Sequence, residues 1–396
     1  MRVDTVSEAD TSAAVAAGPL ADLRVIDLST VIAGPNCARY LADFGADVIK
    51  VERPEGGGDS LRNMAWRDPR DGTGLWWKVI NRNKRTIALD LKDDDDRAVL
   101  LRLLDEADVL VENFRPGTLE RLGLGPDELL VRNPRLVVTR VTGFGQTGPY
   151  ASRPGFATIA EVMSGLSSIS GEPGGQPLLP AIALTDEVTG LVAAFATMVA
   201  LHSGVGQVVD VSLLESLFQL MGPLISLFRL TGEMQPRLGT GLPYTVPRGT
   251  YRCSDGRWVG LSASADSVAA RVNRVLGVGD DPRFATFAAR MANRDALEAI
   301  MVAWCAARPR DEVLRTFTEA EAAIGPVLDM ADIAADPHYA ARDAIVDVDG
   351  TPMQGLVAKL SATAGALRWH GRPLDADGPE IRAHGWSRPR DTPAGD

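Results

Sequence analysis

The sequence predicts an α/β protein with a Rossmann-like core built on a mainly parallel sheet. Short apolar segments, which are typical of buried strands, alternate with helical segments over the first half of the chain. Strands that alternate with helices need crossover connections, and such connections join parallel strands. The expected strands are 24–28, 46–52, 86–91, 108–114, 135–141 and 207–212. The expected helices between them are 35–43, 93–106 and 186–202.

The chain of 396 residues is too long for one small core. Its composition changes after Pro149. The segment 154–180 is rich in Gly, Ser and Pro, which predicts a long functional loop. A second long apolar helix is expected at 213–230. A smaller α+β unit is then expected from Gly249, with a strand at 258–262, helices from 267 to 317 and a β-hairpin around Gly350.

Composition excludes several classes of protein. The net charge of -11 argues against non-specific nucleic-acid binding, which needs a basic surface. The three cysteines form no CxxC pair and no disulfide framework, which fits a reducing cytoplasm. The first 18 residues lack the pattern of a signal peptide, and the longest apolar stretch, 191–201, is too short to span a bilayer. We therefore expect a cytoplasmic protein without a membrane segment.

Two local patterns suggest sites that we do not predict. The acidic run 93–96 resembles a metal site, but acids in the first turn of a helix favour its dipole and Asp93 can cap it, so no metal is expected. The segment Gly143–Gly148 matches G-x-G-x-x-G, yet Pro149 follows, and no helix is expected to start inside the motif as a dinucleotide site requires. Its glycines still predict a backbone that approaches a ligand at the end of a strand.

Seven ordered motifs carry a family resemblance. They are Val31–Pro35, Gly45–Arg53, Asn83–Arg85 with Leu89–Lys92, Val111–Gly117, Gly143–Gly145, Leu184–Gly190 and Gly204–Ser212. The series resembles the class III CoA-transferases, a family that also holds alpha-methylacyl-CoA racemase, over roughly residues 20–382. The resemblance implies an interlocked homodimer of chains with a discontinuous large domain. The implied division is a flexible tail (1–18), the large CoA-binding domain (19–230), a linker and small domain (231–335), and a return segment with a C-terminal tail (336–396).

The resemblance also implies that the large domain binds coenzyme A. Basic residues, which suit the phosphates of CoA, are concentrated in the first third of the chain: Arg53, Lys84, Arg85, Lys92, Arg115 and Arg121. The positions that match the family's CoA site are Val31, Ile32, Ala33, Arg53, Leu89, Lys92, Asn113, Phe114, Arg121 and Thr142. The segment 31–35 lies between a strand and a helix start, where an anionic or adenine group can bind.

Asp186 is the predicted catalytic carboxylate. On its residues alone the position fits a helix N-cap, but the matching Asp is the nucleophile of the family. A carboxylate can attack a thioester and pass through a mixed anhydride and an aspartyl-CoA thioester before a second acid collects the CoA. The resemblance gives Gly143, Phe144 and Gly145 as the loop that shields this chemistry. The expected partners are an acyl-CoA and a free carboxylic acid.

Two alternatives to CoA transfer remain open. A racemase-like enzyme would use Asp186 with a second base, and the family's racemases carry a His where this chain has Phe156. Phenylalanine cannot exchange a proton, which favours transfer over racemisation. The other alternative is a catalytically silent acyl-CoA-binding protein, and the presence of Asp186 and of the glycine loop argues against it.

Overall fold

The computed structural model describes residues 18–386, which form two compact units. The first comprises the described parts of Met1–Ser164, Pro180–Gly222 and His338–Asp396, and the second comprises Gly165–Leu179 and Pro223–Pro337. The predicted N-terminal tail lies outside the described residues except for Gly18, and so does the last part of the predicted C-terminal tail.

The first unit is built on a six-stranded, wholly parallel sheet, as predicted. The strand order is β3-β2-β1-β4-β5-β6. This is the order of a doubly wound Rossmann-like sheet, in which the connections reverse direction between β1 and β4. The strands are β1 (Arg24–Asp27), β2 (Asp47–Glu52), β3 (Lys84–Ala88), β4 (Val109–Glu112), β5 (Val137–Thr142) and β6 (Gln207–Ser212).

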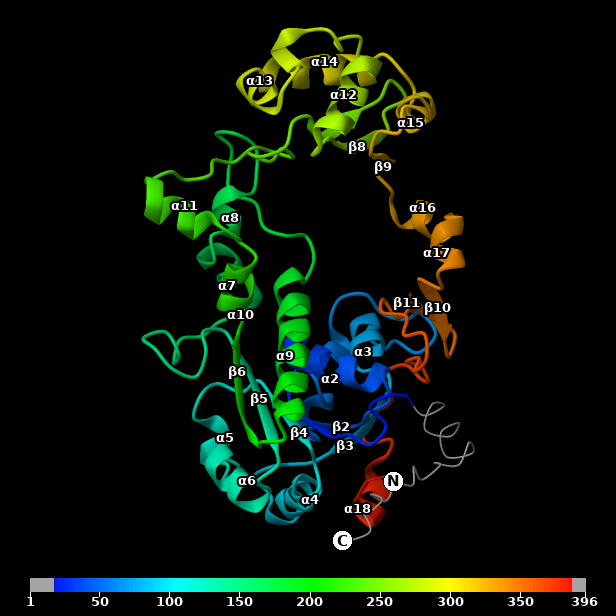
Figure 1. Ribbon diagram of the computed structural model, residues 1–396. Helices are drawn as coiled ribbons and strands as arrows, with labels where there is room; N and C mark the ends of the chain where they lie inside the picture. Colours follow the sequence, from blue (N-terminus) through cyan, green and yellow to red (C-terminus); the bar gives the residue numbers. More distant parts are fainter. Residues whose placement is uncertain (1–17, 387–396) are drawn as a thin grey trace, which may run out of the picture. The chain divides into compact units, whose positions relative to one another are not determined.

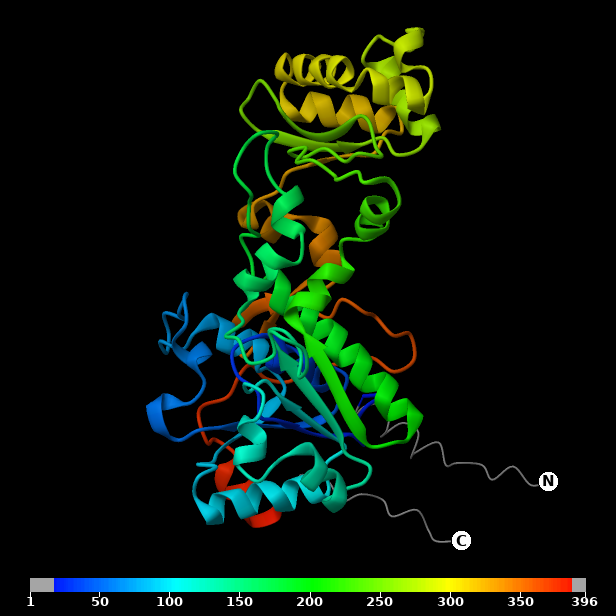
Figure 2. The ribbon, with the colours of Figure 1, turned by 90° about the vertical axis from the view of Figure 1, so that its left-hand side faces the viewer.

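Helices cover both faces of this sheet (Figures 1 and 2). Ile26, Ile49 and Leu110 are adjacent in register and belong to an apolar core that α4, α6 and α18 complete on one face. On the other face α2 packs against α9, and α9 also contacts β5 and β6. The helices of this unit are α2 (Ala33–Asp43), α3 (Leu75–Ile80), α4 (Asp94–Asp105), α5 (Thr118–Arg121), α6 (Pro126–Arg132), α7 (Ala157–Met163), α9 (Leu184–Ser203), α10 (Leu213–Gln219) and α18 (Gly378–His384).

Local signals placed two features correctly. The Asp93 carboxylate accepts hydrogen bonds from the backbone N–H groups of Asp95 and Asp96, so the acidic run begins α4 with a side-chain cap, as its sequence indicated. The hairpin of β10 (Ile345–Val348) and β11 (Thr351–Gln354) turns at Asp349 and Gly350, both with positive φ, which is the backbone of a type I′ turn.

Two expectations about helices and loops were wrong. The apolar stretch 213–230 is not one helix, because α10 ends at Gln219 and α11 (Leu224–Thr231) begins after Gly222 and Pro223. Gly222 adopts a left-handed conformation, and a proline supplies no N–H to continue a helix. The segment 154–180 is also not a plain loop, since it holds α7 and the short helix α8 (Leu166–Ile169).

The second unit has its own sheet and core. The antiparallel sheet β7-β8-β9 supports helices that close over Phe284, Leu297, Met301 and Phe317, all fully buried. Its strands are β7 (Arg248–Arg252), β8 (Trp258–Ser262) and β9 (Ile324–Pro326). Its longer helices are α12 (Asp266–Val275), α14 (Arg294–Ala306) and α15 (Arg310–Glu319). The chain between β9 and the β10–β11 hairpin forms α16 (Met330–Ala335) and α17 (Pro337–Ala341).

One described helix, α9, is long and apolar enough to cross a membrane by length and composition, and α10 with α11 would pass the same test if they were one span. The sequence argument from 191–201 alone therefore does not exclude a membrane segment. In the structure the small residues Gly190, Ala193 and Ala194 of α9 are buried, and the helix packs on α2. The absence of a membrane segment stays a prediction.

Candidate functional site

The loops after β1 and β4 meet where the strand order of the sheet reverses, the place at which open α/β sheets form a ligand crevice. Asn113, directly after β4, joins the two loops. Its Oδ1 accepts a hydrogen bond from the backbone N–H of Thr30 at 2.8 Å, and its Nδ2 donates to the Thr30 carbonyl oxygen at 2.7 Å. The amide side chain therefore fixes the loop that follows β1.

A cavity of about 610 Å³ opens beside these loops. It is lined from the carboxyl ends of four neighbouring strands: Leu28 and Thr30 after β1, residues 51–55 and 58–60 at and after the end of β2, 89–92 after β3, and Phe114 after β4. Four predicted CoA-binding residues lie in its lining, namely Arg53, Leu89, Lys92 and Phe114. The structure thus collects residues that are up to 61 positions apart (53 to 114) around one volume.

Only some of the cationic residues predicted from sequence line the cavity. Arg53 and Lys92 are exposed, and among the described residues neither side chain has an ion-pair partner. Lys84 and Arg85 are instead buried and paired with carboxylates. The Lys84 ammonium is 2.8 Å from the Asp27 carboxylate, and the Arg85 guanidinium is 2.8 Å from the Asp47 carboxylate. Lys84 and Arg85 are therefore structural. Arg121 is exposed on α5 and donates to the Thr118 hydroxyl at 2.8 Å. It is not part of the cavity lining, although Leu122 is.

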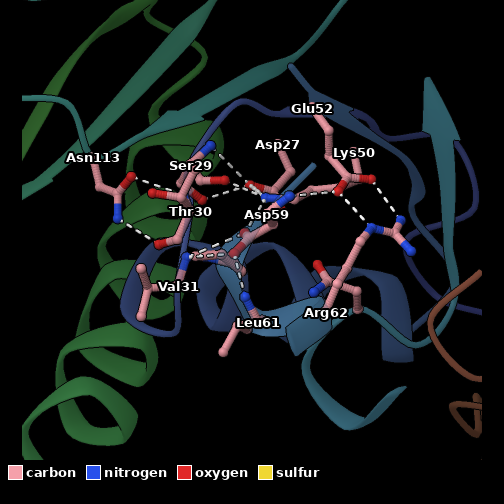
Figure 3. A network of polar contacts seen from close by, with 12 residues as sticks. Asp27, Ser29, Thr30, Val31, Lys50, Glu52, Asp59, Leu61, Arg62 and Asn113 are labelled. Carbon is pink, nitrogen blue, oxygen red and sulfur yellow. Dashed lines mark hydrogen bonds and ion pairs between the residues drawn. The ribbon is translucent and has the colours of Figure 1, made fainter. Parts of the chain in front are cut away.

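The loop between β1 and α2 has a conformation that its sequence does not favour. Val31, a β-branched residue, has φ of 67°, a region that L-residues rarely adopt. Its N–H faces the Asp59 carboxylate, whose two oxygens lie 3.2 and 3.4 Å from the Val31 nitrogen (Figure 3). Ile32 and Ala33 follow at the start of α2, and both side chains are buried. Of the three predicted residues 31–33, only Val31 is partly exposed.

Asp186 lies in the first turn of α9, as its third residue, and the N-cap is Ala183. The interpretation of Asp186 as a helix cap is therefore wrong. Its carboxylate forms no hydrogen bond or ion pair with the residues that the structure describes. Burial, and then the negative charges of Glu161 and Glu187, raise the pKa of Asp186 to about 6. An acid held this way is mostly ionised at neutral pH without being stabilised by a cation.

Neighbouring contacts fix the start of α9. The hydroxyl of Thr185 donates to buried Glu161 of α7 at 2.9 Å. Glu187 accepts from the Asn36 side-chain amide at 2.8 Å, and its carboxylate is 3.7 Å from the Arg39 guanidinium. A Cβ on Gly190 would lie 2.8 Å from the Asn36 Cβ, so glycine is what lets α9 approach α2 this closely. The position of Asp186 is thus set by two packed helices.

The loop Gly143–Gly145 directly follows β5, as expected from its motif, and the first helix after it, α7, begins only at Ala157. Gly143 packs against the backbone of Gly155, and Phe144 makes an edge contact with Tyr150. The N–H of Gly145 donates to the hydroxyl of Thr142 at 3.0 Å. Thr142 therefore holds the glycine loop, and the Gly145 amide is already engaged. No hydrogen bond or ion pair between described residues joins this loop to Asp186.

Sequence reasoning missed three buried charged residues: Lys50 and Asp59 at the cavity, and Glu161 beside the start of α9. All three are buried, at 0%, 3% and 5% exposure. For Lys50 a signal existed: a lysine inside the apolar strand 47–52 of a parallel sheet must be buried, and a buried lysine needs a carboxylate. No comparable signal indicates Asp59 or Glu161, since each lies in a segment of irregular or short helical structure.

The chain is similar to known proteins over most of its length. The model of CoA-transferase family III matches residues 20–377. Succinyl-CoA–D-citramalate CoA-transferase of Chloroflexus aurantiacus is 40% identical over 92% of this chain and 93% of its own length. Succinate–glutarate CoA-transferase of Agrobacterium fabrum is 37% identical over 89% and 91%. The crystal structure of a CAIB/BAIF family protein from Brucella suis superposes with a TM-score of 0.83 at 33% identity, covering 92% of this chain and 99% of that one. The chain belongs to CoA-transferase family III and is a CoA-transferase, as its motifs predicted.

Proposed function

We propose that the protein moves CoA from an acyl-CoA to a free carboxylic acid by a ping-pong route in which Asp186 is the nucleophile. The observation that carries this proposal is the state of Asp186. It is a partly buried carboxylate close to two further acids, it has no cationic partner among residues 18–386, and its pKa is raised to about 6. A poorly solvated carboxylate that is still ionised at neutral pH is a better nucleophile than one that an ion pair stabilises.

The chemistry balances without any other group. A carboxylate oxygen of Asp186 attacks the thioester carbonyl carbon, the C–S bond breaks, and CoA thiolate leaves a mixed anhydride. The thiolate attacks the aspartyl carbonyl of the anhydride, and the donor acid departs as its carboxylate. The acceptor carboxylate then attacks the aspartyl-CoA thioester and expels the thiolate, which attacks the acceptor's carbonyl in the new anhydride. Asp186 is restored, and no net proton is taken up or released.

The cavity at the carboxyl ends of β1 to β4 is the proposed site for the nucleotide part of CoA. Arg53 and Lys92 are lining residues without ion-pair partners among the described residues, so they are available for phosphate groups. Val31, Ile32, Ala33, Leu89, Asn113 and Phe114 would form or support the walls. Arg121 would reach a phosphate only from the rim. The glycine loop is proposed to shield the anhydrides from water, and its oxyanion donors would have to be amides other than that of Gly145.

The relatives suggest which acids to test first. Their names specify succinyl-CoA with citramalate, succinate with glutarate, and, for an Acetobacter aceti enzyme 35% identical over 94% of this chain and 97% of its own, acetyl-CoA with oxalate. All three use at least one dicarboxylic acid. We therefore propose succinyl-CoA as donor and a dicarboxylic acid of four or five carbons as acceptor.

Two further expectations belong to this proposal. We propose an interlocked homodimer of cytoplasmic chains. Exposed apolar side chains on α9 support an assembly, since Leu191, Phe195 and Val199 are 55%, 69% and 54% exposed in the single chain. Interlocked chains would not separate on dilution, and a monomer detected by light scattering at low concentration would contradict them.

The test is to incubate the purified protein with succinyl-CoA and a panel of free acids and to identify new thioesters by mass. Hydroxylamine or borohydride added with the donor alone should modify Asp186 and no other carboxylate. Transfer without any labelling of Asp186 would refute the route through this residue. Exchange of the α-hydrogen with deuterated solvent in the absence of an acceptor would instead indicate a racemase-like enzyme.

A further inference from the structure

A buried network of charged residues surrounds the loop Ser29–Val31, which we call the β1 loop. Side chains hold nearly every backbone polar group of this loop (Figure 3). The Ser29 N–H donates to Asp27 at 3.1 Å, and its carbonyl oxygen accepts from the Lys50 ammonium. Asn113 holds both polar groups of Thr30, and Asp59 accepts from the N–H of Val31. The loop is thus fixed by side chains from β1, β2 and two other loops.

The charges in this network balance. Three carboxylates, Asp27, Glu52 and Asp59, are paired with the three cations Lys50, Arg62 and Lys84. The Lys50 ammonium is 3.6 Å from Asp27 and 3.5 Å from Asp59, and it is fully buried. Buried charges are retained only when paired, and removing one partner leaves an uncompensated charge. Here that charge would lie directly beneath the proposed CoA site.

Asp59 connects three elements that line or adjoin the cavity. Its carboxylate also accepts from the Leu61 N–H at 2.9 Å, and its own N–H donates to Glu52 at 2.9 Å. Glu52 is bonded to Arg62 at 2.8 and 2.7 Å. On the far side, a Cβ on Gly34 would lie 2.5 Å from Ser29, so the first turn of α2 leaves the loop no room to relax. The left-handed Val31 is therefore kept in place by Asp59 on one side and by α2 on the other.

We propose that Lys50 and Asp59 are positioning residues that hold the β1 loop in the conformation that binds CoA. The inference rests on the proposed placement of the CoA nucleotide in this cavity. Neither residue needs to touch the reacting atoms. Their effect comes through Val31 and Ser29, because a loop that is competent for only part of the time binds its ligand more weakly by that fraction.

The test compares CoA binding, turnover and stability in matched variants. Asp59→Ala removes the acceptor for Val31, and Lys50→Met removes the buried charge while keeping much of the side-chain volume. Lys78→Met is the control, since Lys78 forms an equally buried Lys–Asp pair with Asp68 at 2.6 Å and does not line the cavity. If the β1 loop of Asp59→Ala adopts its CoA-binding conformation about a tenth of the time, the Kd of the variant for CoA and its KM for acyl-CoA rise about tenfold. Its kcat at saturating acyl-CoA should stay near that of the wild type.

Other measurements separate positioning from general stability. We expect Lys78→Met to lower the Tm as the two test variants do, yet to leave CoA affinity unchanged. Amides of residues 29–31 should exchange with solvent faster in CoA-free Asp59→Ala than in the wild type. Asp59→Asn keeps one acceptor oxygen and should bind CoA with intermediate affinity, and it carries the test if the alanine variant does not fold.

Two results would overturn the inference: unchanged CoA affinity in folded Asp59 and Lys50 variants, or an equal loss of affinity in Lys78→Met. The Arg53→Ala variant distinguishes a wrong positioning role from a wrong placement of the CoA site. If Arg53→Ala weakens CoA binding while the Asp59 variants do not, only the positioning role is lost. If the wild type binds no CoA, or Arg53→Ala and Lys92→Ala leave binding unchanged, the placement of CoA itself is wrong and the inference is lost with it.

Discussion

Replacing Asp186 with asparagine should make the protein more stable at neutral pH while abolishing transfer. Burial and the nearby Glu161 and Glu187 raise the pKa of Asp186 from 3.8 to about 6. A pKa raised in the folded state means that the folded protein binds this proton more tightly than the unfolded chain does. Stability from this group is therefore fully present below about pH 3.8 and is lost as the pH rises through about 6.

The size of the effect follows from the same values. A difference of ~2 between the two pKa values corresponds to about 3 kcal/mol against folding above pH 7. Partial exposure to solvent reduces this figure, and asparagine also loses the attraction of a charge to the helix N-terminus, which is worth about 0.3–1 kcal/mol. We expect Asp186→Asn to be about 1–2 kcal/mol more stable than the wild type near pH 8, with the gap closing toward about pH 4.

Urea unfolding followed by circular dichroism across that pH range measures this difference. Asp127→Asn is the control, because Asp127 also lies in the first turn of a helix, α6, but is exposed. It should lose a few tenths of a kcal/mol, ~0.3, with little change over the pH range. An Asp186→Asn protein that is less stable than the wild type at pH 8, or that retains transfer after deamidation is excluded, would refute the reasoning.

Three further outcomes are expected. Calorimetric titration should show that Arg53→Ala and Lys92→Ala each weaken CoA binding by about 1–3 kcal/mol, more at low salt. Arg97→Ala should not, because this partly exposed residue of α4 is not in the cavity lining. Glu187→Gln removes one of the charges that raise the pKa of Asp186, so the acidic limb of the kcat/KM–pH profile should move below about pH 6, and an unmoved limb would contradict the assignment. Gly190→Ala should destabilise the protein by about 1–3 kcal/mol in urea unfolding, whereas Gly260→Ala, with open space around it, should not.

Much of the first unit was predictable because its strands are short, apolar and separated by helices. The strand 207–212 was predicted at its observed bounds, and the parallel sheet followed from the alternation of elements. The break at Gly222–Pro223 was legible in principle, but the apolar residues on both sides outweighed it in the prediction of one helix. The pattern of apolar residues indicates which segments are buried better than it indicates whether a helix is continuous.

Sequence reasoning identified residues that line the cavity, but not the buried residues that support them. Arg53 and Lys92 carry charge in loops that follow strands, and this position alone suggests binding. The roles of Lys84 and Arg85 could not be predicted, because the sequence around a cationic residue in a strand does not show whether a ligand phosphate or a buried Asp neutralises it. Pairing depends on register between strands, and register is set by the whole sheet.

The buried carboxylates Asp27 and Asp59 and the partly buried carboxylate of Asp186 lie in opposite electrostatic surroundings. Asp27 and Asp59 lie beside the Lys50 ammonium, so their charge is compensated and the β1 loop above them is held rigid. Asp186 lies beside two other acids, and no cation in the described part of the chain compensates its charge. An uncompensated carboxylate costs stability, and packing of α9 against α2 must supply the difference. An uncompensated carboxylate stays in one position only if the helices around it are firmly packed. Here the close approach at Gly190 and the Asn36–Glu187 hydrogen bond hold α9 against α2. The carboxylate whose replacement is expected to stabilise the fold is then the one on which turnover is proposed to depend.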